Sequence, residues 1–126
     1  MEIWKPIPIK GFENYYEVSN YGNVRSLDRV IITKNGRYYR RSGGMMKMQV
    51  NKVSKLLQVM LSCHKRYKLC YIHRLVADAF LNKPTDPNKK FITHLDGNLL
   101  NNHADNLAYI SMKEIVNNIL NKKRNG

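Results

Sequence analysis

His94 stands where a side chain can act on a substrate. It follows a short apolar segment, Phe91–Thr93, precedes a turn at Leu95–Asn98, and is trailed by an asparagine-rich stretch that reaches Asn106. Hydrolysis of a phosphodiester needs a base that activates water, a divalent cation, and a group that fixes the tautomer of the base. The segment contains residue types for all three tasks, although a lone histidine near a turn is more often a plain hydrogen-bonding residue.

Two cysteines and two histidines form a second candidate cluster. Cys63, His64, Cys70 and His73 are residue types that bind zinc, but the cysteine spacing lacks the close C-x2-C pair of common zinc sites. A reducing cytosol disfavours a disulfide between the two thiols. We therefore expect two buried thiols on a pair of strands, with a zinc-binding module as the alternative.

The charge is strongly positive and unevenly distributed. The chain of 126 residues has 22 Lys and Arg against 9 Asp and Glu, a net charge of +13. No acidic residue lies between Asp28 and Asp78, and tyrosines interleave with the basic residues there, which is typical of a surface that follows phosphates. This favours nucleic acid as the partner over a membrane or an acidic protein. The DNA-binding candidates in this acid-free stretch are Arg29, Lys34, Arg37, Arg40, Arg41, Lys47, Lys52, Lys55, Lys65, Arg66, Lys68 and Arg74.

The acid-free stretch also predicts two basic hairpins. Val30–Thr33 is rich in β-branched residues, and Asn35–Gly36 is typical of a type I′ turn before a returning strand. Leu57–Leu61 and Lys68–Ile72 are the strands of the second hairpin, around a polar turn at His64–Tyr67. A basic ribbon of this kind fits either groove of a duplex.

The remaining elements frame these hairpins. Residues 15–19 and 23–27 predict a small N-terminal hairpin, with Trp4 and Phe12 as core on its apolar side. His73–Leu81 has the apolar spacing of an amphipathic helix.

The last helix has the strongest local signals. Ser111 and Glu114 have the spacing of a capping box, and Ile110 and Ile115 have that of a hydrophobic staple. The helix should begin at Met112. The length suits one compact domain or two small modules that share a core. The chain has no long apolar run and no signal-peptide pattern, so a cytoplasmic location is expected.

Two parts of the chain resemble the phage HNH homing endonucleases. Trp4–Ile7 with Gly11–Ser26 resembles their N-terminal NUMOD-type motif, and Ile72–Phe80 with Thr93–Leu107 resembles their HNH signature. The resemblance covers nearly the whole chain. It implies an α+β fold with three segments: a β-hairpin module at 1–28, a basic hairpin region at 29–72, and a ββα-metal region at 73–126.

The resemblance also implies a chemistry. It is that of a metal-dependent endonuclease that nicks or cuts double-stranded DNA with Mg²⁺ or Mn²⁺, in the cytoplasm of a bacterial host cell. By analogy, His94 takes the position of the general base, and Asn106 that of the asparagine which ties the loop and orients the base.

Two positions depart from the family pattern. Thr93 and Ile115 fall where members of the family place metal ligands, but Thr93 offers only a neutral hydroxyl and Ile115 cannot bind a metal. Asn118 lies one turn beyond Ile115 on about the same helix face, so Thr93 and Asn118 become the candidate ligands. The alternative leaves Asn118 merely exposed beside an apolar face. Asp96 is a weaker candidate because it belongs to an expected turn.

These departures leave two functions open. The first is a small HNH endonuclease with His94 as the base. The second is a catalytically degenerate protein of the same fold that acts by binding DNA or a protein partner. Near the site, Arg74 is expected to touch phosphate, and His73 to be either a polar contact near the site or a residue that opens a helix.

Overall fold

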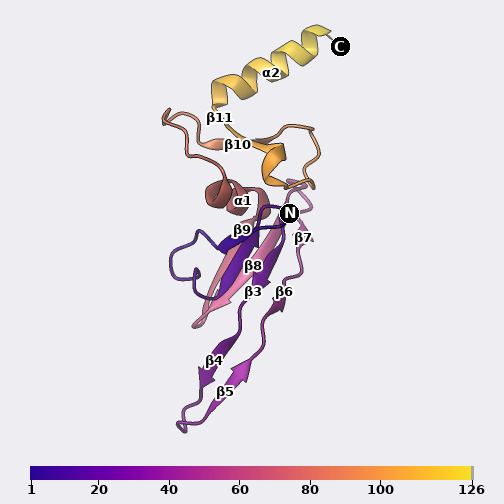
Figure 1. Ribbon diagram of the computed structural model, residues 1–126. Coiled ribbons are helices and arrows are strands. Elements are labelled where there is room, and N and C mark those ends of the chain that lie inside the picture. Colours follow the sequence, from indigo (N-terminus) through magenta and orange to yellow (C-terminus); the bar gives the residue numbers. More distant parts are fainter. Residues whose placement is uncertain (126) are drawn as a thin grey trace.

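The computed structural model describes the backbone of residues 1–125 and the side chains of residues 1–121. Its N-terminal part is a four-stranded antiparallel sheet in the order β1-β2-β3-β6 (Figure 1). The strands are β1 (Trp4–Pro6), β2 (Tyr16–Ser19), β3 (Val24–Ser26) and β6 (Gly44–Met45). The β2–β3 pair confirms the hairpin expected from the sequence.

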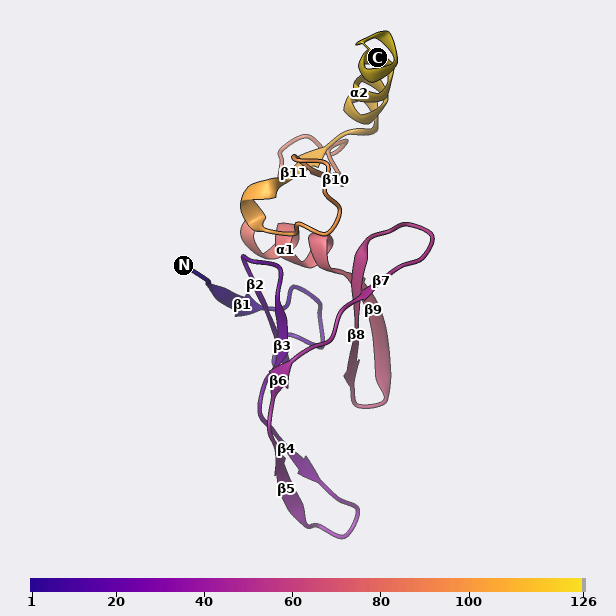
Figure 2. The ribbon, with the colours of Figure 1, turned by 90° about the vertical axis from the view of Figure 1, so that its right-hand side faces the viewer.

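The acid-free stretch forms two antiparallel hairpins, as expected. The first, called the ribbon below, comprises β4 (Arg29–Ile32) and β5 (Tyr38–Arg41) and projects away from the rest of the molecule (Figures 1 and 2). The second belongs to a three-stranded sheet of β7 (Gln49–Val50), β8 (Leu57–Cys63) and β9 (Arg66–Tyr71). The β8–β9 hairpin and the ribbon extend in the same general direction, away from the C-terminal helix.

The turn of the ribbon differs from the expected type. Thr33 donates its N–H to the Arg37 carbonyl at 2.7 Å, and Gly36 takes the left-handed conformation with φ of 77°. Asn35 does not have a positive φ. The expected type I′ turn at Asn35–Gly36 is therefore wrong, because a longer loop places only the glycine in the left-handed region.

The left-handed two-residue geometry occurs instead at the other hairpin. His64 and Lys65 have φ of 49° and 63° and connect Cys63 to its cross-strand partner Arg66. The turn is shorter than the expected His64–Tyr67, and Ile72 begins a helix rather than ending a strand.

The C-terminal part contains the elements of a ββα unit. Strands β10 (Phe91–His94) and β11 (Leu107–Ile110) pair in antiparallel fashion after helix α1 (Ile72–Phe80). A short 3-10 turn, η1 (Ala104–Asn106), precedes β11, and helix α2 (Met112–Asn125) follows it. The observed α1 and the start of α2 agree with the sequence expectations. The Ser111 hydroxyl accepts the Glu114 N–H at 3.2 Å, as expected for the first half of a capping box.

One hydrophobic core joins all three sequence segments. Val18 of β2, Leu61 of β8, Leu75 of α1 and Leu107 of β11 are buried in the same cluster. Phe12 lies in this core as expected. Trp4 does not, because it is only partly buried and lies under the Arg25 guanidinium at 4.0 Å.

Both thiols are buried, and the described helices are short. Cys63 and Cys70 are free and belong to the core cluster on neighbouring strands, and burial raises the pKa of the Cys70 thiol. Among the described residues, no helix has the length and apolar character needed to cross a membrane.

The molecule is elongated, with an α+β fold as expected. The ribbon marks one end and α2 the other, while α1, β10 and β11 lie between them (Figure 1). The ββα unit and the basic ribbon are therefore held at a distance from each other along one axis.

Candidate active site

His94 occupies the last position of β10 and is 8% exposed. Its Nε2 lies 2.7 Å from the Oδ1 atom of Asn102. An amide oxygen accepts a hydrogen bond, so this pairing assigns the ring proton to Nε2. The lone pair of Nδ1 is then available as a base, which is the protonation state that proton abstraction requires.

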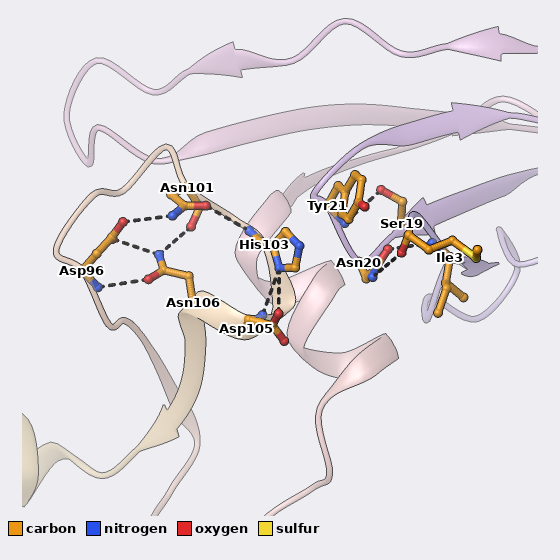
Figure 3. Close-up of polar contacts among 10 residues, drawn as sticks. Ile3, Ser19, Asn20, Tyr21, Asp96, Asn101, His103, Asp105 and Asn106 are labelled. Carbon is orange, nitrogen blue, oxygen red and sulfur yellow. Dashed lines mark hydrogen bonds and ion pairs between the residues drawn. The ribbon is translucent and has the colours of Figure 1, made fainter.

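Asn106 ties the loop between β10 and β11 into one conformation (Figure 3). Its Nδ2 donates to Asp96 Oδ1 at 2.9 Å and to the Asn101 carbonyl at 2.8 Å, while its Oδ1 accepts the Asp96 N–H at 3.0 Å. The side chain that touches His94 is Asn102, not Asn106. Of the two tasks that the family resemblance assigned to Asn106, the hydrogen bonds show loop tying, and the direct contact with the base comes from Asn102.

Asp96 is engaged within the same loop. Its carboxylate accepts hydrogen bonds from the Asn98 N–H and from the side chains of Asn101 and Asn106. These bonds, led by the one from Asn101, lower the pKa of Asp96, so the carboxylate is charged at neutral pH. Because several loop groups donate hydrogen bonds to the Asp96 carboxylate, it stabilises the turn, as the sequence suggested.

A groove of about 950 Å³ opens beside His94 between β10 and α2. Thr93 and Asn118, the two candidate ligands, both line it, and so does Ile115. The structure thus brings the expected base and the two expected ligands to one cavity. The other lining residues are Leu56, His73, Ile92, Leu95, Asp96, Gly97, Leu99, Ile110, Ile119 and Asn121.

The donor atoms in this groove do not fit an ordinary Mg²⁺ site. Mg²⁺ is held by carboxylates and water, whereas Thr93 and Asn118 supply only neutral oxygens. The Asp96 carboxylate also lines the groove, but its oxygens are engaged by hydrogen bonds within the loop. Within the described residues, no three His, Cys, Asp or Glu side chains are grouped so that they could hold a metal ion.

His73 adds a second imidazole to the groove. Its ring centroid lies 5.4 Å from that of His94, and its Nδ1 is buried without a hydrogen-bond partner among the described residues. Burial, followed by repulsion from His94, lowers the pKa of His73 to about 4. The ring is therefore neutral at physiological pH, and it gives the groove no fixed positive charge.

Tyr109 connects the ββα unit to α1. Its hydroxyl donates to Asp78 Oδ1 at 2.8 Å, and burial together with this bond raises the pKa of Tyr109 to about 12. Arg74 belongs to the same group, because it donates to the Lys90 carbonyl at 2.9 Å and lies 3.8 Å from Asp78. Its guanidinium is thus partly occupied within the molecule.

The basic candidates are spread over the ribbon, the β8–β9 hairpin and the segment between them, except Arg74, which lies in α1. Two of the twelve form ion pairs: Arg40 with Asp28 at 2.7 Å, and Arg74 with Asp78. Arg29 and Arg66 stack over Tyr15 and Phe12. Across the part of the chain with described side chains, the others form neither an ion pair nor such a stack, namely Lys34, Arg37, Arg41, Lys47, Lys52, Lys55, Lys65 and Lys68.

Asn102 is the site residue that the sequence did not single out. It stood among the asparagines of the loop, and spacing alone did not show which of them reaches the histidine. The separation of eight positions from His94 spans an irregular loop, for which no helical or strand period applies.

The fold and site define a class of protein. Residues 2–62 match the NUMOD4 motif, and residues 70–116 match the HNH endonuclease family. The chain therefore carries a NUMOD4 motif followed by an HNH endonuclease region and is homologous to the HNH homing endonucleases, as the sequence resemblance indicated.

Particular relatives are known from a virus and a phage. The chain is 36% identical over 117 residues to an uncharacterized HNH endonuclease of Acanthamoeba polyphaga mimivirus, covering 91% of this chain and 25% of that relative. It is 31% identical over 119 residues to the DNA endonuclease I-HmuI of Bacillus phage SP01, covering 94% of this chain and 58% of that protein.

A solved structure shows the same fold. The structure described as DNA binding and cleavage by the HNH homing endonuclease I-HmuI superposes with a TM-score of 0.72 at 30% identity, covering 96% of this chain and 59% of that one. The chain therefore spans between a quarter and three fifths of the length of these relatives.

Proposed function

We propose that this chain is a DNA endonuclease of the HNH type that hydrolyses phosphodiester bonds of duplex DNA. The observation that carries the proposal is the state of His94. Its Nε2 is fixed on Asn102 at 2.7 Å, in a groove on the HNH region, and its Nδ1 is left with a lone pair. A buried imidazole held in one tautomer is suited to general-base catalysis.

In the proposed reaction, His94 Nδ1 takes a proton from a water molecule while the water oxygen forms a bond to phosphorus. The P–O bond to the leaving oxygen then breaks, and that oxygen takes up a proton from solvent water. The ring charge that develops on His94 is shared with Asn102 through the Nε2–H bond. Asn106 acts indirectly, because it keeps the loop that carries Asn102 in shape.

A divalent metal ion is the other component of the proposed reaction. HNH nucleases use a divalent ion, which stabilises charge on the phosphate and on the leaving oxygen. Thr93 and Asn118 are the expected ligands among the neutral oxygen donors that line this groove, and we expect them to bind Mg²⁺ or Mn²⁺ weakly.

The ribbon and the β8–β9 hairpin are proposed to follow the DNA backbone. Their support is the exposed set of basic side chains without acidic partners, together with exposed Tyr38 and Tyr39 on β5. Such contacts position a duplex without reading its sequence. The relatives come from a virus and a phage, so an infected host cell is the proposed setting.

A second candidate function is DNA binding without cleavage. The specific observation that favours it is Ile115, which gives the groove a hydrocarbon wall at the position where the sequence resemblance implies a metal ligand. In this case the chain would occupy a DNA site and leave it uncut.

One experiment separates the two functions. Supercoiled plasmid is incubated with the chain and Mn²⁺ or Mg²⁺, and the wild type is compared with His94→Ala in both cleavage and binding. For the endonuclease, we expect cleavage by the wild type and its loss by about 10² or more in His94→Ala, with DNA affinity retained. Binding by both proteins without cleavage by either would support the second function.

A further inference from the structure

The turn between β2 and β3 of the N-terminal sheet contacts the loop that connects β10 and β11. Ala104 donates its N–H to the Asn20 carbonyl at 2.8 Å, and the rings of Tyr21 and His103 stack with centroids 5.0 Å apart. Figure 3 shows both segments side by side, with Tyr21 facing His103. Part of the NUMOD4 region therefore packs against the loop that contains Asn102.

The turn itself is rigidly built. Ser19 is fully buried, and its hydroxyl oxygen accepts the N–H groups of Tyr21 and Asn23 at 3.2 and 3.1 Å. Asn20 fixes the N-terminal strand by accepting the Ile3 N–H at 2.7 Å. This turn is thus suited to hold a neighbouring side chain in place.

Gly22 in this turn lies directly against Asn102. It has φ of 91°, and a Cβ atom built there would lie 3.1 Å from Asn102 Cβ and 3.2 Å from the Asn102 carbonyl oxygen. A side chain at this left-handed backbone position would be strained, and its Cβ atom would require Asn102 to shift by a few tenths of an ångström. The contact fixes where Asn102 can lie.

Asn102 is poorly explained by stability alone. It is 4% exposed, its Oδ1 pairs with His94, and its Nδ2 is buried without a partner among the described residues. A buried donor without a partner costs free energy that an apolar residue would not. The benefit that offsets this cost is found in the one bond that Asn102 makes, which is to the candidate base.

We propose that Asn102 is the positioning residue of His94, and that the β2–β3 turn of the NUMOD4 region positions Asn102 in turn. The inference rests on the proposed function for the role of His94, but its geometry does not depend on cleavage. The NUMOD4 region then has a second role in addition to its proposed contact with DNA. It holds the general base of the HNH region, His94, in position. If the Asn102 amide were turned around, Nδ2 would donate to Nε2 and the proton would lie on Nδ1, so the base would be lost.

The first test is nuclear magnetic resonance of the His94 ring in the intact chain at one neutral pH. In the wild type we expect an observable Nε2-bound proton that exchanges slowly with water. Asn102→Ala should speed this exchange by about tenfold or more, while Asn102→Asp, which keeps an acceptor oxygen, should retain the slow signal. A ring proton on Nδ1, or a slow signal that survives in Asn102→Ala, would overturn the proposal.

The second test concerns the turn and has a matched control. Gly22→Ala should speed exchange of the His94 proton, because its Cβ displaces Asn102. Gly36→Ala carries similar backbone strain at φ of 77° but meets no atom within 4 Å, so it should leave the signal unchanged. Equal effects of the two variants would refute the proposal that the β2–β3 turn positions Asn102.

DNA cleavage provides an independent test of the positioning role of Asn102. If the wild type cuts DNA, Asn102→Ala should lower kcat by about tenfold with KM unchanged, and Asn102→Asp should restore most of it. Cleavage that is fully retained in Asn102→Ala contradicts the positioning role. A wild type that does not cut contradicts the proposed function alone, since the resonance tests still decide the role of Asn102.

Discussion

At the residue scale, the groove joins a well-positioned imidazole to a poor set of metal donors. His94 has one defined hydrogen-bond partner, whereas the neighbouring wall is formed by Ile115 and Ile119. The same isoleucine has a structural reason to be present, because Ile115 and Ile110 occupy staple positions around the start of α2. The side chain at position 115 therefore suits the start of the helix and supplies no metal donor to the groove.

Restoring the ligands should restore metal binding. We expect Thr93→Asp combined with Ile115→Asn to raise Mn²⁺ affinity by about tenfold or more, because a carboxylate and an amide oxygen replace a hydroxyl and a hydrocarbon. Isothermal titration calorimetry measures this directly. The matched control pairs Thr93→Asp with Val116→Asn, which adds the same amide at a half-exposed position that does not line the groove. Equal affinities of the two double variants would show that position 115 is not at the metal site.

The neutral state of His73 predicts a pH-dependent stability. Its pKa is about 4 in the folded chain and near its ordinary value of 6.5 when unfolded. Between these values the unfolded chain binds the proton, so stability is complete above pH 6.5 and falls as the pH is lowered toward 4. We expect a loss of about 1 to 2 kcal/mol, below the full linkage value because the ring is partly exposed and solvent screens its charge.

Urea unfolding at several pH values checks this expectation. The difference between the wild type and His73→Gln isolates His73 from the other histidines. A pH dependence that is identical in the two proteins would refute the assignment.

At the element scale, sequence patterns predicted most elements but not the details of their connections. The amphipathic helix at α1, the capping box of α2 and both basic hairpins follow from local periodicity and side-chain chemistry, so they were predictable. The left-handed turn fell on His64–Lys65, whose residue types favour it less than Asn-Gly does, because the paired strands on either side impose the geometry. Asn102 was missed for a similar reason. Its contact with His94 depends on how the irregular loop packs against Gly22, and local spacing does not show that packing.

The ribbon is the element whose charges are expected to meet DNA. Arg37 and Arg41 form no ion pair with the described side chains, whereas Arg40 is held by Asp28, whose pKa is lowered mainly by the Gly43 N–H and then by Arg40. We expect Arg37→Glu with Arg41→Glu to weaken DNA binding by about tenfold or more, equally on unrelated sequences, because phosphate contacts carry no sequence information.

Fluorescence anisotropy with several duplexes measures this effect. Lys83→Glu makes the same charge change at an exposed position outside the acid-free stretch and serves as the control. A loss confined to one sequence would identify Arg37 or Arg41 as a base reader instead.

At the scale of the whole molecule, the elongated shape separates the ribbon, which is proposed to bind DNA, from the groove that contains His94. The ribbon lies at one end and α2, whose residues Ile115 and Asn118 line the groove, lies at the other (Figure 1). A duplex that reaches both would have to lie along the long axis, where it would meet basic side chains from several elements. The shared core then matters for the proposed function, because it fixes the distance between the surface proposed to bind DNA and the proposed general base, His94.

This arrangement predicts how binding depends on salt. Contact along the long axis involves many separate phosphates, and each neutralised phosphate releases a counterion. With about six such contacts, affinity should fall by about 10³ between 50 and 200 mM salt. Binding confined to the groove would involve one or two phosphates, and affinity would fall by only about three- to tenfold over the same range. The slope measured on the wild type, and its decrease in the Arg37→Glu and Arg41→Glu double variant, therefore shows whether the two ends of the molecule act on the same duplex.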